Sequence, residues 1–180
     1  MCKQCNTRPV YVFTNKRQVC KTCFIRWFQD KVLYTMRKFL MAKKDEVIGY
    51  KKGNSFRDVV LEDVLKYYET RAPVDVVKMP SKRVNKIAVS SATDQEAEKI
   101  IYSLINGDLK LLKVSPVEGK IIKPLYLFLD KEVMLYAKLR KLKFNSKKDK
   151  KTKFSIIINE LEKKHPEVKR AIVNSYLKFM

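Results

Sequence analysis

The sequence predicts an α/β protein, in which a small parallel sheet with C-terminal helices follows an N-terminal four-cysteine zinc ribbon. Strand-like runs alternate with amphipathic helical runs from residue 45 onward, and all four cysteines lie within the first 23 residues. About 46% of the 180 residues are apolar, which is enough for a buried core. We divide the chain into a zinc ribbon (1–23), a basic amphipathic linker helix (24–44), an α/β domain (45–142), a Lys-rich loop (143–153) and a C-terminal helix pair (154–180).

The cysteines form two pairs with the same spacing, Cys2-x2-Cys5 and Cys20-x2-Cys23. Each pair places two thiolates on one tight turn, and two such turns supply the tetrahedral set that zinc takes. The alternative is a redox pair, but a thioredoxin-like site needs a single CxxC beside a βαβ unit. We therefore predict one structural Zn²⁺, because four sulfur ligands leave no open position for water. We expect the ribbon to have a core of its own, separate from that of the α/β body.

The predicted elements follow from periodicity and turn residues. Apolar residues recur at helical spacing over 24–41, and the aromatic side of that helix is expected to pack on the body. Strands are predicted at 10–13, 46–49, 74–77, 86–90 and 121–129, and further helices at 59–68, 93–105, 132–142, 154–164 and 167–179. Thr93 and Glu96 are expected to form a capping box at the start of one helix.

Positive charge is concentrated at the two ends of the chain. The total is +21, and residues 1–44 carry 11 Lys and Arg against 1 acidic residue while residues 131–180 carry 15 against 5. If the ends lie side by side, they make a face that attracts a polyanion. The alternatives are that the Lys excess only keeps the protein soluble or reflects an AT-rich genome, or that it binds an acidic membrane or protein surface. The candidate RNA contacts are Arg8, Lys16, Arg17, Lys21, Arg26, Arg37, Lys38, Lys147, Lys148, Lys150 and Lys151.

No catalytic constellation is visible in the sequence. The loop of Tyr50, Lys51, Lys52, Gly53, Asn54 and Ser55 follows a strand and opens a helix, where α/β proteins bind phosphates. With one glycine it cannot form a phosphate cradle, so we interpret it as an ordinary turn and expect no ATP. His165 is interpreted as a capping residue. Asp94, Glu96 and Glu98 are interpreted as complements to a helix dipole rather than a metal cluster.

The start of the chain lacks the apolar stretch of a signal peptide, and no run approaches the length of a membrane span. We therefore expect a cytoplasmic protein with no membrane partner.

Four stretches, in order, resemble the cytosolic tRNA 2-thiolation proteins of the PP-loop (ATP-pyrophosphatase) superfamily. Residues 20–28 (CKTCFIRWF) look like the family's ribbon-to-helix junction, and residues 86–97 (KIAVSSATDQEA) are similar to its KIATGHNxDDEA segment. Residues 122–137 contain IKPLY and KEVMLYA, which are similar to its IKPLY…KEVxLYA segment. Residues 160–169 (ELEKKHPEVK) resemble its C-terminal LExxHPxxK pattern. The resemblance implies a reduced PP-loop domain, of the adenine nucleotide alpha hydrolase type.

The departures from the family are as informative as the matches. Active members carry an SGGKDS loop, of which only the final serine remains at Ser55. Ser91 and Ala92 stand in place of the His-Asn pair, and the cysteines that active members use in the domain body are absent. The resemblance therefore implies a pseudoenzyme, the degenerate partner of a heterodimer with a catalytically intact PP-loop paralogue. Its expected role is to bind tRNA during thiolation of the wobble uridine.

Two other functions stay open at this point. The chain could be a free-standing zinc-ribbon RNA-binding protein with no part in thiolation. It could also be an active tRNA-modifying enzyme whose site the sequence does not reveal.

Overall fold

The structure is a computed structural model that describes residues 1–107, 114–145 and 152–179. The chain opens with an antiparallel hairpin of β1 (Tyr11–Val12) and β2 (Gln18–Val19), followed by the long helix α1 (Lys21–Lys38). The remaining elements are β3 (Val47–Tyr50), α2 (Phe56–Glu69), β4 (Asp75–Lys78), β5 (Lys86–Ala88), α3 (Thr93–Ile105), β6 (Val117–Glu118), β7 (Ile121–Ile122), α4 (Asp130–Leu139), α5 (Lys153–Lys164) and α6 (Val168–Phe179).

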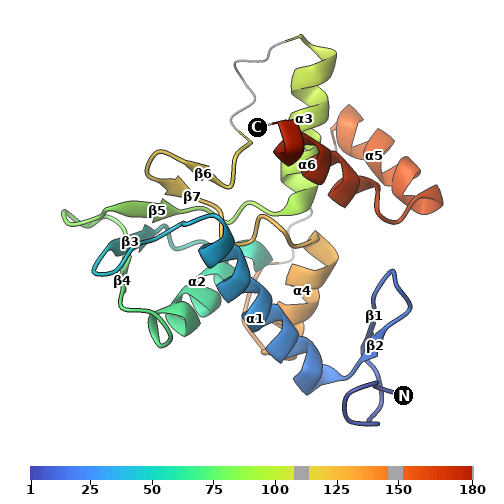
Figure 1. Ribbon diagram of the computed structural model, residues 1–180, viewed down its shortest axis with the longest axis horizontal. Coiled ribbons are helices and arrows are strands. Elements are labelled where there is room, and N and C mark those ends of the chain that lie inside the picture. Colours follow the sequence, from blue (N-terminus) through green and yellow to red (C-terminus); the bar gives the residue numbers. More distant parts are fainter. Residues whose placement is uncertain (108–113, 146–151, 180) are drawn as a thin grey trace.

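The main sheet has the order β4-β3-β5-β7-β6 (Figure 1). Its first four strands are parallel, and β6 joins β7 antiparallel at one edge. The predicted α/β class is therefore confirmed. β3 lies between β4 and β5, so the chain leaves β3 in one direction across the sheet and later returns to its other side. In such folds the crevice beyond the carboxyl ends of the two strands at this switch point is the usual place for a ligand.

The hairpin and the body share one core, so the expectation of a separate ribbon core is wrong. A single apolar cluster runs from Cys2 and Val19 through the buried face of α1 to the helices of the body. Figure 1 shows α1 running from the hairpin toward the sheet. The ring of Phe28 on α1 lies 4.2 Å from that of Phe128 and 4.2 Å from that of Tyr136, so rings from distant parts of the chain pack together.

Several local predictions need correction. The N-cap of α3 is Ala92, whose N–H donates to Gln95, so the predicted capping box of Thr93 and Glu96 is wrong. The Thr93 hydroxyl instead donates to the carbonyl of Tyr126 at 2.8 Å, and the Glu96 carboxylate is taken by lysines. The predicted strand over 121–129 is confined to β7, and hydrogen-bonded turns follow it as far as α4.

The C-terminal helices α5 and α6 pack against α3, with Ala97, Ile100 and Val173 in a second small cluster. Among the residues that the structure describes, no helix is both long enough and apolar enough to cross a membrane.

Candidate functional site

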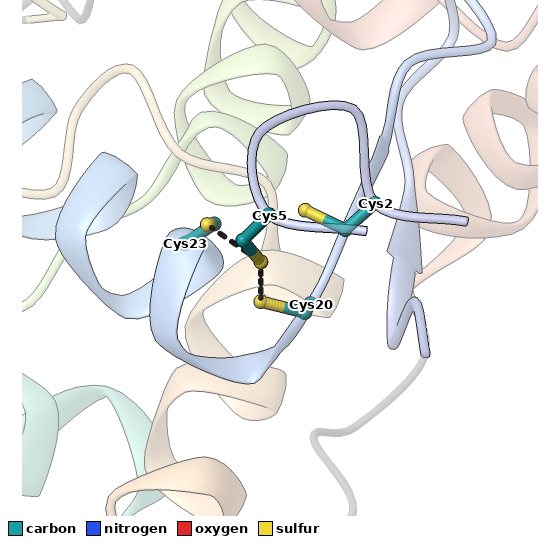
Figure 2. Close-up of side chains that lie close together, drawn as sticks. All are labelled: Cys2, Cys5, Cys20 and Cys23. Carbon is teal, nitrogen blue, oxygen red and sulfur yellow. Dashed lines mark hydrogen bonds between the residues drawn. The ribbon is translucent and has the colours of Figure 1, made fainter. Parts of the chain in front are cut away.

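The four cysteines come together at the junction of the hairpin and α1 (Figure 2). Their Sγ atoms all lie within 4.8 Å of one another, with Cys5 3.3 Å from Cys20 and 3.7 Å from Cys23. Sulfurs about 2.3 Å from a tetrahedral zinc stand about 3.8 Å apart, so this arrangement fits one such ion. Because α1 begins at Lys21, Cys20 is its N-cap and Cys23 lies in its first turn.

The surroundings of the sulfurs favour thiolates at two of the four positions. The backbone N–H of Gln4 lowers the pKa of Cys2, and the hydroxyl of Thr7 lowers that of Cys20 to about 6. The pKa of Cys23 is raised, first by burial and then by its neighbouring sulfurs. Four thiolates this close together would repel one another. A bound cation would stabilise all four in the deprotonated form.

The loop of Tyr50 to Ser55 ends in a carboxylate that belongs to the chain itself. Ser55 is the N-cap of α2, and Asp58 completes a capping box with it. One oxygen of Asp58 accepts from the backbone N–H of Ser55 at 3.3 Å and from its hydroxyl at 2.7 Å. The other accepts from the Ser90 hydroxyl, beyond the end of β5, at 2.5 Å. Gly53 makes room for this carboxylate, because a Cβ there would lie 2.1 Å from it.

Asp58 thus lies at the switch point between β3 and β5, where a helix N-terminus would otherwise be open to an anion. Lys51 and Lys52 are exposed beside this loop. The spacing of Ser55 and Asp58 is that of a capping box, which the sequence-based predictions did not include. The contact with Ser90 could not be read from the sequence, because that residue lies 32 positions away.

The predicted RNA contacts are described only in part. Arg8, Lys16, Lys21, Arg26, Arg37 and Lys38 are exposed, whereas Lys147, Lys148, Lys150 and Lys151 lie outside the described residues. Arg17 is half-buried, with its guanidinium 4.5 Å from the centre of the Phe13 ring. All of them stay predictions as RNA contacts.

The N-terminal and C-terminal basic segments meet at one buried carboxylate, that of Glu132. Lys31 of α1 and Arg170 of α6 lie 4.0 Å and 2.6 Å from the oxygens of Glu132, which is fully buried. The hydroxyl of Tyr11 in the hairpin donates to the same side chain at 3.2 Å. The N-terminal and C-terminal segments therefore meet in the fold, as a continuous positive face requires.

A cavity of about 980 Å³ lies beyond the ends of β5 and β7, a feature that the sequence did not predict. Ser91, Gln95 and Phe154 are among the residues that line it. Its floor holds the buried Lys123, which pairs with Glu96 at 2.9 Å and with Glu118 at 2.7 Å. Because those carboxylates neutralise the lysine, the charged group is held in place rather than left free.

His165 is an exposed residue at the C-terminal end of α5, as expected of a capping residue. Asp94 and Glu96 are each paired with a lysine, Lys169 at 2.6 Å and Lys123 at 2.9 Å. These pairs favour an electrostatic role over metal binding at this helix start.

Comparison with known proteins gives one informative result. No protein-family model and no curated protein matches the chain. Among solved structures the chain is similar to the U34-tRNA thiolase NcsA from Methanococcus maripaludis with its [4Fe-4S] cluster. The TM-score is 0.81 at 19% sequence identity, over 99% of this chain and 86% of that chain.

In this chain such a cluster would have only the four cysteines of the ribbon as thiolate ligands, since the sequence contains no others. In a four-iron cluster each thiolate binds its own iron, which holds the ligand sulfurs farther apart than a single ion does. The close sulfurs of the ribbon fit the single ion better. The resemblance seen in the sequence is thus confirmed for the architecture: this chain has the fold of the U34-tRNA thiolase NcsA, with a four-cysteine cluster at its N-terminus.

Proposed function

We propose that this protein is a non-catalytic subunit of a tRNA wobble-uridine 2-thiolation complex, which binds tRNA and a catalytically intact PP-loop paralogue. One observation carries the proposal: a thiolase fold is retained while the chain's own Asp58 carboxylate lies at the switch point. A nucleotide phosphate placed there would have to displace a carboxylate that already accepts three hydrogen bonds. The fold supports a role in tRNA thiolation. The Asp58 carboxylate at the switch point supports a subunit that binds tRNA without catalysing the reaction.

The metal of the ribbon is proposed to be a structural Zn²⁺. Cys2, Cys5, Cys20 and Cys23 would hold it, and their spacing favours one tetrahedral ion. When bound, it would neutralise the crowded thiolates and tie the N-terminus to the first turn of α1.

The tRNA-binding part of the proposal depends on charge. The exposed Arg26, Arg37 and Lys38 on α1 can neutralise phosphates, and the same helix meets the C-terminal segment where Lys31 and Arg170 face Glu132. Such contacts position an RNA without reading its sequence. We expect similar affinity for different tRNAs and a steep loss of affinity as salt is raised.

A pull-down tests the partner. The chain, expressed with an affinity tag beside an SGGKDS-containing paralogue from the same genome, is expected to recover that paralogue and its tRNA. A matched bait with Cys20→Ser, which removes one metal ligand, tests whether recovery of the paralogue depends on the metal site. Repeated failure of the intact chain to recover the paralogue would contradict the subunit role. It would favour the free-standing RNA-binding protein if tRNA binding persisted.

The cavity beyond β5 and β7 favours a second candidate, an active tRNA-modifying enzyme with an unrecognised site. Isothermal titration with ATP and Mg²⁺ distinguishes the two. Saturable binding that is weakened by Lys123→Met would support the enzyme, with Lys120→Met, an exposed lysine nearby in the chain, as the control. Heat changes no larger than those of dilution would support the non-catalytic subunit.

A further inference from the structure

Helix α1 carries a second ordered face opposite its buried one. The buried face consists of Phe24, Phe28, Val32 and Met36. The other face follows the same helical period, in which residues three and four positions apart fall on one side of the helix. Its members are Cys23, Arg26, Trp27, Asp30, Lys31 and Tyr34. All six line a groove of about 770 Å³ that begins at the cysteine cluster.

Most of this face is open to solvent, although the side chain of Lys31 is only 20% exposed and donates to the carbonyl of Leu127. The side chain of Arg26 is 86% exposed and Tyr34 is 51% exposed. Trp27 is half-buried, because its inner side contacts the ring of Phe13 with centroids 4.6 Å apart. Among the described residues no acceptor is found for the indole N–H of Trp27, and that N–H is not buried. The groove therefore offers both apolar surface and a free donor.

Each aromatic ring of the groove has a cation beside it. The Nζ of Lys31 lies 5.1 Å from the centre of the Trp27 ring, and that of Lys38 lies 5.7 Å from the centre of the Tyr34 ring. Trp27 and Tyr34 are seven residues apart, which places them about 10.5 Å apart along the helix axis. A groove that offers aromatic rings beside exposed cations, here Arg26 and Lys38, is suited to single-stranded nucleic acid, which it can bind through base stacking and phosphate contacts.

We propose that this groove binds an unpaired, single-stranded segment of RNA, with bases against Tyr34 and the exposed edge of Trp27 and phosphates on Arg26 and Lys38. The inference rests on the RNA-binding part of the proposed function and adds to it a site and a kind of segment. A duplex keeps its bases stacked on one another and offers these rings nothing to stack on. The net charge of +10 over residues 1–44 favours a polyanion over a neutral peptide.

Trp27 is the single tryptophan of the chain, so its fluorescence reports on this groove alone. The purified full chain is titrated with a decamer of uridine, with a ten-base-pair RNA duplex and with heparin, a polyanion without bases. The decamer is expected to quench Trp27 saturably. Heparin and the duplex are expected to bind, as seen by anisotropy competition, with little change in Trp27 emission.

Variants test the stacking directly. Tyr34→Ala is expected to weaken decamer binding about 5- to 150-fold, since stacking on one aromatic ring accounts for about 1–3 kcal/mol per base. Tyr34→Phe should retain most of the affinity. Tyr67→Ala is the matched control, because Tyr67 is also a helix tyrosine, with the guanidinium of Arg71 5.5 Å from its ring centre.

The outcomes separate this inference from the proposal on which it rests. If the chain binds the decamer but Trp27 emission stays constant and Tyr34→Ala binds as the wild type does, the groove assignment is overturned and RNA binding stands. Equal quenching by poly-glutamate would also overturn it, in favour of an acidic protein partner. If the chain binds neither RNA nor tRNA at any salt concentration, both the inference and the RNA-binding part of the proposed function fail.

Discussion

Replacing Asp58 by alanine removes the carboxylate that joins the loop after β3, the start of α2 and the end of β5. The side chain accepts two hydrogen bonds from Ser55 and one from Ser90. Losing a helix-capping partner costs about 1 kcal/mol, and a hydrogen bond to a charged group contributes about 1.5–3 kcal/mol. Because the three bonds share one carboxylate, we expect a total loss of about 2–4 kcal/mol.

For a domain of this size, each kcal/mol lowers Tm by about 2–4 °C, so Tm should fall by roughly 4–16 °C. Circular dichroism in urea and during heating measures both quantities. Asp58→Asn keeps the shape and one acceptor oxygen, so it should lose about half as much, and Asp75→Ala at an exposed position is the control. Inorganic phosphate should raise the Tm of Asp58→Ala more than that of the wild type. A Tm within 1 °C of the wild type, with no phosphate effect, would refute the view that Asp58 fills an anion site.

Three further predictions test the shared core and its charges. Cys20→Ser should release the metal and shift a single calorimetric transition to lower temperature. Two separate transitions would show that the ribbon unfolds independently of the body and would contradict the shared core. Phe28→Ala should cost about 3–5 kcal/mol in urea denaturation, because the ring is fully buried, and Leu40→Ala, 80% exposed, should change little. Burial lowers the pKa of Lys31 from 10.5 to about 8, so Lys31 loses its proton at lower pH in the folded state than in the unfolded state. Stability should rise between about pH 8 and 10.5 relative to Lys31→Met, and parallel pH profiles would contradict this.

The features that the sequence predicted correctly are those encoded over short distances. Helical and strand periodicity repeats within a dozen residues, and each CxxC pair specifies its own turn. The shared core was missed because it depends on rings far apart in the sequence, as when Phe28 packs on Phe128 and Tyr136. The cap of α3 was predicted wrongly for a related reason. Glu96 has the spacing of a capping residue, but the distant Lys123 pairs with it instead.

Helix α1 and the apolar core against which it packs link the metal site to the proposed RNA groove. Cys20 ends the loop before α1 and Cys23 starts the groove, so a metal bound to both would fix the first turn of the helix. Phe24 and Phe28 then set the rotation of α1, because they are buried on the side opposite the groove. The groove face of α1 is thus oriented by the metal and the core together, while the carboxylate of Asp58 lies at the switch point between β3 and β5. If the proposed groove binds RNA, that binding would not depend on a nucleotide, as the proposed role of a binding subunit beside an active paralogue requires.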